Sequence, residues 1–348
     1  MFIPLTRRVA VVLLASIVWV SVLFTSSRLD WENSDLEPPR LLRNESLESS
    51  SAVDSGPQFA YAQYATSLNY LCNAIINFHR LDRFGTRHDM VLIFPESWSE
   101  GKTPEAKAIR KLRADHPRLV LRPFEYLRIS KTKASATWAD SLNKFHAFAL
   151  TEYSRVLIFD SDTQVLNNMD HLFLVPRAPV AVPRAYWLNE LEATAEEHVL
   201  SSHVMLIEPD TQLHDALVEE SLSSGMLDMD LVNRRFKDTA MLLPHRRLAL
   251  LTGEFRGGDH QRYLSPNRHE EWDPVAEASG AYMVHFSDWP MPKPWEPRTA
   301  EQWSAALPAC EASEADRPGR PRCADRLVWT GFYEDYDRDR KMYCRRLG

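Results

Sequence analysis

Two aspartates, Asp160 and Asp162, stand on either side of Ser161 directly after the apolar run 156–159. A short uninterrupted apolar run is typical of a strand that is buried on both faces in a parallel sheet. Ligands of such sheets collect beyond the carboxyl ends of the strands. Two carboxylates spaced by one residue can bind a hard divalent cation, and that cation can bridge the phosphates of a nucleotide. The pair therefore predicts a metal and nucleotide site, and an acidic turn after a strand is the alternative interpretation.

The elements that would hold this pair in place alternate along the chain. Segments with the pattern of strands lie at 58–65, 90–94, 119–121, 156–159, 180–182 and 203–207. Segments with the pattern of helices lie at 68–81, at 103–115, where Thr103 and Pro104 suit a helix start, and at about 141–151. Strands that alternate with helices predict an α/β fold. We expect one folded domain over 58–348, with a less regular tail after Trp295.

The N-terminal region predicts a membrane anchor and a tether. Residues 9–24 form an apolar run without charge, and Arg7-Arg8 precedes it. Because positive residues stay on the cytosolic side, residues 1–27 are predicted to be a cytoplasmic tail and a transmembrane signal anchor. A cleaved signal peptide is the rival interpretation. Residues 28–57 are rich in Ser, Glu, Asp and Pro, and they predict a flexible lumenal stem that carries the glycosylation pattern 44–46.

Charge and cysteine content narrow the class of protein. The formal net charge is −7, so nonspecific attraction to nucleic acid is not expected, and an anionic ligand needs a metal or a local cation. Cys310 and Cys323 flank a polar loop that a disulfide could close in an oxidising compartment. Cys72 lies in a helical apolar pattern and is predicted to be a buried apolar residue. Without a Cys-x-x-Cys pair, a structural zinc site is not expected.

Three segments together resemble a known enzyme family. They read SLNKFHAFA over 141–149, VLIFDSDTQVLNNMDHL over 156–172 and VHFSDWPMPKPW over 284–295. The combination resembles the glycogenin-like family eight of retaining glycosyltransferases, and most closely the fungal N-acetylglucosaminyltransferases that are anchored in the Golgi. The resemblance covers about 61–295. It implies the GT-A fold, a Rossmann-like mixed sheet flanked by helices.

The resemblance assigns ligands to the metal and the donor. It makes Asp160 and Asp162 the metal and ribose ligands within the Asp160-Ser161-Asp162 donor site, and His285 the third protein ligand of Mn²⁺. Taken alone, His285 would be expected to be a histidine satisfied in the core. Lys293 matches the lysine that contacts the diphosphate of the donor. The family's glycine between this histidine and lysine is absent here and the spacing is longer, so the geometry of the loop is open. An ordered surface loop packed by Trp289 is the alternative.

Further donor contacts follow from the same resemblance. Lys144 precedes Asp160 at the family's interval for a lysine that reaches the donor, although it could be an ordinary solvated lysine of a helix. Tyr64, Thr66 and Tyr70 align with the residues that hold uridine and ribose. Tyr64 could stack on the base or fill the core.

Asp228 is the candidate catalytic residue. The segment 228–233 resembles the family's Asp-Gln-Gly segment at a helix start, with Met229 and Asp230 in place of glutamine and glycine. A carboxylate there could act as nucleophile or stabilise an oxocarbenium-like transition state. Capping of the helix is the alternative role. Segment 200–203 stands where the family has Asn-Ser-Gly, which predicts altered contacts with donor or acceptor. The segment 184–187 could form an acceptor platform, or its tryptophan could belong to the core.

The sequence therefore predicts a single-pass type II Golgi enzyme with a lumenal catalytic domain. It is expected to transfer GlcNAc from UDP-GlcNAc with Mn²⁺ and retention to a mannose-containing glycan, and a homodimer is possible by analogy with some relatives. UDP-glucose and UDP-galactose are the alternative donors. The rival classes are a noncatalytic glycan-binding protein on the same fold and a metal-dependent phosphohydrolase. The phosphohydrolase is disfavoured because the sequence lacks a histidine-rich two-metal cluster.

Overall fold

The computed structural model describes residues 58–116, 118–128, 140–189, 197–267, 269–310, 321–345 and 347. All of them belong to one compact unit, Ser55–Gly348. The predicted anchor, 1–27, and the predicted stem, 28–57, lie outside the described residues. In the part of the chain that the structure describes, no helix combines the length and apolar character needed to cross a membrane.

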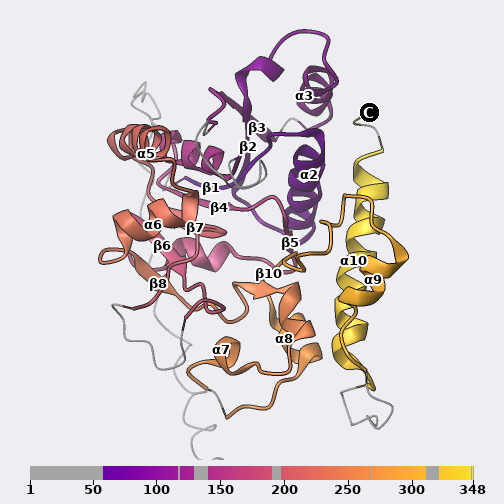
Figure 1. Ribbon diagram of the computed structural model, residues 1–348. Coiled ribbons are helices and arrows are strands. Elements are labelled where there is room, and N and C mark those ends of the chain that lie inside the picture. The colour runs from indigo at the N-terminus through magenta and orange to yellow at the C-terminus, as the bar shows by residue number, and fades with distance from the viewer. Residues whose placement is uncertain are drawn as a thin grey trace, which may run out of the picture. The chain divides into compact units, whose positions relative to one another are not determined.

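A seven-stranded mixed sheet forms the centre of the unit (Figure 1). Its strands stand in the order β3-β2-β1-β4-β7-β6-β8. Strands β1, β2, β3 and β4 run parallel, whereas β7 is antiparallel to both β4 and β6. The bounds are Phe59–Tyr64 for β1, Asp89–Pro95 for β2, Leu119–Phe124 for β3, Arg155–Phe159 for β4, Val180–Pro183 for β6, Val204–Ile207 for β7 and Met241–Leu243 for β8. The six predicted strands are confirmed, and the fold is mixed α/β with a largely parallel sheet.

Helices cover both faces of this sheet, because alternate side chains of its strands point to opposite sides. On one face, Tyr61 and Leu157 pack with α2 and α3. On the other face, Ala62 and Ile158 pack with η2, α5 and α6. The bounds are Leu68–Arg83 for α2, Pro104–Asp115 for α3, Asp140–Ala149 for the 3₁₀ helix η2, Thr211–Ser224 for α5 and Asp228–Phe236 for α6. Thr103 caps α3 through a bond from the Ala106 N–H, as predicted.

A second, three-stranded sheet follows the aspartate pair directly. It has the order β5-β10-β9, with bounds Thr163–Val165, Met283–His285 and Leu250–Leu251. Strand β10 pairs antiparallel with β5, and His285 stands opposite Thr163. Residues 160–162 therefore connect the last residue of β4 in the large sheet to the first residue of β5 in the small sheet. The turn that carries the predicted metal ligands is also the junction of the two sheets.

The C-terminal region is more regular than predicted. After Trp295 the chain forms α9, Ala300–Ala306, and α10, Ala324–Tyr343, so the expected irregular tail is wrong. Helix α10 buries a stripe made by Trp329, Phe332, Tyr333 and Tyr336, whose spacing is that of one helical face. The remaining elements are η1 (Glu96–Trp98), η3 (Asp170–Leu174), η4 (Thr252–Arg256), α7 (Gln261–Leu264) and α8 (Pro274–Gly280).

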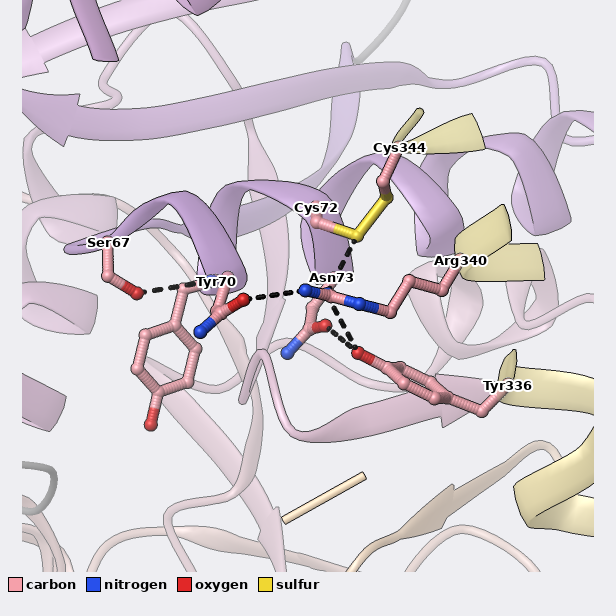
Figure 2. The surroundings of a disulfide bond; sticks show 8 residues. Ser67, Tyr70, Cys72, Asn73, Tyr336, Arg340 and Cys344 are labelled. Carbon is pink, nitrogen blue, oxygen red and sulfur yellow. Dashed lines mark hydrogen bonds between the residues drawn. A yellow bond between two sulfur atoms is a disulfide. The ribbon is translucent and has the colours of Figure 1, made fainter. Parts of the chain in front are cut away.

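Helix α10 is fastened to α2 by a disulfide and by polar contacts (Figure 2). Cys72 is buried in an apolar cluster as predicted, but it also pairs with Cys344, 272 residues away, where spacing cannot reveal the partner. Around this bond, Arg340 donates to Asn69 and the Tyr336 hydroxyl donates to Asn73. A buried ion pair between Arg80 and Asp339, at 2.6 Å, joins the same two helices. The disulfide between Cys310 and Cys323, which the sequence left possible, is present.

Candidate functional site

The predicted site residues converge beyond the carboxyl end of β4. Asp160 and Asp162 follow β4, His285 ends β10, Lys144 comes from η2, and Asp228 is the first residue of α6. The backbone fixes their register, because the Asp160 N–H donates to the His203 carbonyl and the Phe286 N–H donates to the Asp162 carbonyl. Residues that lie up to 141 positions apart, from Lys144 to His285, thus meet at one place.

Asp160, Asp162 and His285 could hold a metal ion. One ligand atom of each lies within 4.8 Å of the others, and all three side chains are partly accessible. His285 Nδ1 is buried without a hydrogen-bond partner in the described part of the chain, so this histidine is not satisfied in the core. Two carboxylates and an imidazole suit several divalent ions, Mn²⁺ among them. The residues present therefore fit the predicted metal.

Asp162 is the most strongly paired of the three. Its Oδ1 lies 3.1 Å from His285 Nε2, and its Oδ2 lies 2.7 Å from Lys293 Nζ. Burial alone would raise the pKa of Asp162, but His285 and Lys293 together hold the pKa well below its usual range. Asp162 is therefore an anionic ligand, and Lys293 reaches the metal site from the loop that follows β10.

Lys144 is a buried cation between two carboxylates. Its side chain is 1% exposed, and its Nζ lies 2.5 Å from Asp160 Oδ1 and 2.6 Å from Asp228 Oδ2. The Nζ also donates to the Ser202 carbonyl at 3.1 Å. Burial would lower the pKa of Lys144, but Asp160 and Asp228 raise it above the usual value, so the amine stays charged. The alternative of an ordinary solvated lysine does not match this burial.

Asp160 and Asp228 respond differently to this shared lysine. Burial, with a smaller contribution from the neighbouring Asp162, outweighs the opposing effect of Lys144 and raises the pKa of Asp160 to about 6. For Asp228, burial also acts to raise the pKa, but Lys144 and the hydroxyls of Ser141 and Ser202 outweigh it, and the pKa is lowered. The Asp228 carboxylate is therefore the better anion of the two when no metal is bound.

The local structure argues for a role of Asp228 beyond helix capping. Leu227 is the N-cap of α6, and no side chain makes a capping bond there. Asp228 Oδ1 instead accepts a bond from Ser141 Oγ at 2.6 Å, and Oδ2 accepts one from Ser202 Oγ at 2.7 Å. The individual roles of Ser141 and Ser202 were not predicted. The departure from Asn-Ser-Gly over 200–203 was the signal available for Ser202, and for Ser141 it was the place of this residue at the start of the matching segment 141–149.

The predicted nucleoside contacts lie at the end of β1. The Tyr64 ring is 5% exposed and packs in the core, while its hydroxyl donates to Asp160 Oδ1 at 3.3 Å. Ser161 Oγ donates to the Tyr64 carbonyl, so this hydroxyl points into the protein. Thr66 Oγ1 is buried without a partner in the described part of the chain. Burial, with Asp162 and Asp160 next in effect, raises the pKa of Tyr70 above its usual value, which places Tyr70 near the aspartate pair.

Two hollows differ in their relation to these residues. A small hollow lined by Tyr64, Thr66 and residues that end β2 and β3 adjoins the predicted nucleoside contacts, but it is too small to hold a water molecule. A larger cavity of about 1060 Å³ is lined by Phe59, Arg155 and Glu208, near the amino ends of β1 and β4, and contains none of the predicted site residues. The predicted site residues and the larger cavity therefore lie at opposite ends of the strands.

The predicted acceptor platform over 184–187 is only partly available. The Tyr186 ring is 3% exposed and packs against His245 and Tyr263, so it belongs to the core. Trp187 is half-buried, and its ring centroid lies 5.8 Å from that of His203, next to the site. Of this segment's two aromatic rings, Trp187 alone keeps an accessible part.

His146, two residues after Lys144, is expected to make the protein sensitive to acid. Burial, together with the neighbouring His214, outweighs the hydrogen bond to the Glu125 carbonyl and lowers the pKa of His146 to about 4. The unfolded chain binds a proton near pH 6.5 and the folded chain does not, so stability is complete above pH 6.5 and falls as the pH decreases toward 4. The loss attributable to His146 is about 3 kcal/mol. Urea unfolding of wild type and His146→Gln at pH 8 and pH 5 should show a smaller pH dependence in the variant. An unchanged dependence would contradict this assignment.

Comparison with known proteins places the chain among named relatives. No protein-family model matches it. It is 42% identical over 305 residues to "Glucose N-acetyltransferase 1" of Gibberella zeae, an alignment that spans 84% of this chain and 63% of that relative, less than two thirds of its length. It is 39% identical over 301 residues to the protein of the same name from Aspergillus fumigatus, spanning 82% of this chain and 77% of the relative.

The solved structures are more distant. The galactosyltransferase LgtC in complex with donor and acceptor sugar analogs shares 15% identity, over 71% of this chain and 92% of that chain, with a TM-score of 0.47.

Proposed function

The chain belongs to the glucose N-acetyltransferase 1 family, a glycosyltransferase family, and on that premise we propose that it transfers N-acetylglucosamine from UDP-GlcNAc to a glycan with retention of configuration. The proposal includes the GT-A fold, membership of the glycogenin-like family eight and dependence on Mn²⁺. The observation that carries it is the convergence of Asp160, Asp162 and His285 beyond β4, with Lys144 and Lys293 beside them.

The side chains of this site suit a nucleotide diphosphate. A divalent cation bound by Asp160, Asp162 and His285 would neutralise the charge of the diphosphate as the sugar leaves. Lys293 Nζ, which now contacts Asp162, adds a positive charge on the same side. We assign the base and ribose to the surroundings of Thr66 and Tyr70, since the hollow beside Tyr64 is too small to hold them. Together they would hold the leaving group, which is where negative charge develops.

Asp228 is proposed to act on the sugar. Lys144 and two hydroxyls hold its carboxylate in the ionised form and in one orientation. An ionised carboxylate can act as nucleophile or stabilise an oxocarbenium-like transition state, which a retaining transfer requires. The preference for GlcNAc rests on the relatives' printed name and the sequence resemblance, so UDP-glucose and UDP-galactose remain the comparison donors.

The cellular setting is part of the proposal. The apolar run 9–24 after Arg7-Arg8 supports a type II anchor in the Golgi membrane, with the catalytic domain in the lumen. Two disulfides, Cys72–Cys344 and Cys310–Cys323, agree with an oxidising compartment. We propose a mannose-containing glycan as the acceptor and a homodimer as the assembly.

A donor panel tests the proposed function. The full-length protein is incubated with UDP-GlcNAc, UDP-glucose or UDP-galactose, with MnCl₂ or with EDTA, and released UDP is measured. We expect UDP release only with the metal and fastest with UDP-GlcNAc, because the cation is needed to hold the diphosphate. Asp162→Ala should lose this activity and bind UDP more weakly in the presence of Mn²⁺, as measured by calorimetry.

The control is Asp238→Ala, which removes an exposed aspartate outside the site and should behave like wild type. If no UDP-sugar is turned over and Asp162→Ala binds UDP as tightly as wild type, the enzymatic proposal is wrong. A protein that binds UDP with Mn²⁺ but turns over no donor would instead favour the noncatalytic glycan-binding class.

A further inference from the structure

Trp289 is unusually exposed for a tryptophan. Its residue surface is 84% exposed, in the loop that connects His285 at the end of β10 to Lys293. Tryptophan is a large apolar side chain that is highly buried on average, and its rings dominate the energetics of binding surfaces. The alternative interpretation, an ordered surface loop packed by Trp289, is therefore wrong, because the ring lies in solvent.

The loop itself is firmly held on both sides of this ring. Asp288 is 4% exposed, and its Oδ2 accepts bonds from Trp329 Nε1 at 3.1 Å and from the Tyr333 hydroxyl at 2.8 Å, both on α10. The Met291 N–H donates to the Asp288 carbonyl, and Met291 is buried. The backbone around Trp289 is thus anchored while its ring is left outside. The backbone of this loop therefore needs little ordering when a ligand binds the ring.

The same loop begins and ends at the predicted metal site. His285 Nε2 and Lys293 Nζ both contact Asp162, and Lys293 Nζ also donates to the Phe286 carbonyl, which closes the base of the loop. Trp289 is four residues from His285 and four from Lys293. Four residues span at most about 14 Å, so the Trp289 backbone lies within the length of a few sugar rings from the metal ligands.

The surroundings of Trp289 suit a small ligand better than a protein partner. The other large apolar side chains exposed among the described residues belong to other segments, namely Leu174, Leu188, Leu222, Leu242, Leu327 and Met342. Within the loop, Met291 is buried and Lys293 is engaged with Asp162. A stable protein interface buries about 800 Å² on each partner, far more than one indole supplies. One isolated, anchored ring matches the size of one sugar ring.

We propose that Trp289 is a stacking platform for a sugar ring of the acceptor glycan. The flat indole face would pack against the C–H face of the sugar, and the anchored loop would place that sugar beside the donor held by His285 and Lys293. This inference rests on the proposed function, since it assigns the acceptor side of the same site. It makes Trp289 a specificity-determining residue in addition to Trp187, the residue of the expected platform that keeps an accessible part.

Acceptor kinetics test the inference. The full-length protein is given labelled UDP-GlcNAc, MnCl₂ and one of four probes: methyl α-mannoside, α-mannobiose, lactose or cellobiose. Transfer to each probe is measured, and UDP release without a probe is measured separately. Trp289→Ala should raise the KM for the best acceptor about tenfold, the effect of truncating a central aromatic contact, and leave UDP release without acceptor unchanged. Trp289→Phe, which keeps an aromatic face, should recover most of the affinity.

Leu327→Ala is the matched control, since it truncates another exposed apolar side chain, on α10, and should leave the acceptor KM unchanged. The inference is overturned if Trp289→Ala keeps the wild-type KM, or if wild type hydrolyses UDP-GlcNAc but transfers to none of the probes. A change in sedimentation of Trp289→Ala with an unchanged KM would make the ring an interface between copies, which also overturns it. Failure of the proposed function is distinct, because wild type would then release no UDP from UDP-GlcNAc at all.

Discussion

Replacing Lys144 with methionine is expected to lower UDP release from UDP-GlcNAc by about a thousandfold and to destabilise the protein by about 3 to 5 kcal/mol. The amine lies between Asp160 and Asp228, at 2.5 Å and 2.6 Å, and is 1% exposed. Methionine fills a similar volume but leaves two neighbouring carboxylates without their shared cation. Their repulsion and burial would then oppose folding, and Asp228 would lose the interaction that keeps it ionised. Urea unfolding and UDP release measure the two effects separately.

The double variant Lys144→Met/Asp228→Asn tests whether the loss of stability comes from the two unpaired carboxylates. Removing one of the two unpaired carboxylates should return part of the lost stability, while UDP release stays low because Asp228, which is proposed to act on the sugar, and the lysine that holds it are both altered. Lys237→Met is the control, since Lys237 is exposed and outside the site. A Lys144→Met protein as stable as wild type would contradict the role of Lys144 as the shared counter-ion.

Removal of the disulfide Cys72–Cys344 in the double variant Cys72→Ser/Cys344→Ser is expected to destabilise the protein by about 5 kcal/mol. The two cysteines are 272 residues apart, and a cross-link over so long a loop removes much of the freedom of the unfolded chain. The disulfide Cys310–Cys323 closes a loop with a separation of 13, for which the same relation gives about 3 kcal/mol, so Cys310→Ser/Cys323→Ser is the matched comparison.

The same variant should also affect donor binding. Helix α10 carries Trp329 and Tyr333, which hold Asp288 in the loop before Lys293. Loosening α10 from α2 is therefore expected to raise the KM for UDP-GlcNAc. Urea midpoints and donor kinetics are compared for the two serine pairs. Equal loss of stability in both pairs, with an unchanged donor KM, would show that the long-range cross-link has no special role.

Local sequence patterns were sufficient to predict most strands of the large sheet. The buried runs at 90–94 and 156–159 are strands β2 and β4, and Thr103 begins α3 as its type and the following proline predict. These features depend on neighbours in sequence, so propensity and periodicity reveal them. The resemblance to a known family was needed to connect Asp160 with His285, since 125 residues separate them and only the pairing of β5 with β10 brings them together.

Long-range packing explains what was missed. Cys72 looks like any buried residue of an amphipathic helix until α10 places Cys344 against it. Helix α10 itself has a readable stripe in Trp329, Tyr333 and Tyr336, but its many charged residues obscure the pattern. Ser141 and Ser202 gain their role only because η2 and the segment before β7 both approach Asp228. No single stretch of sequence contains that information.

The turn 160–162 joins the two sheets, so the proposed metal would have a structural role as well as a chemical one. Asp160 continues from β4 of the large sheet, whereas His285 ends β10 of the small sheet. A cation bound by both residues would link the two sheets. Part of its binding free energy would therefore make the small sheet more rigid. The loop that carries Trp289 starts from β10. Binding of the donor and its metal would therefore also make this proposed acceptor-binding loop more rigid.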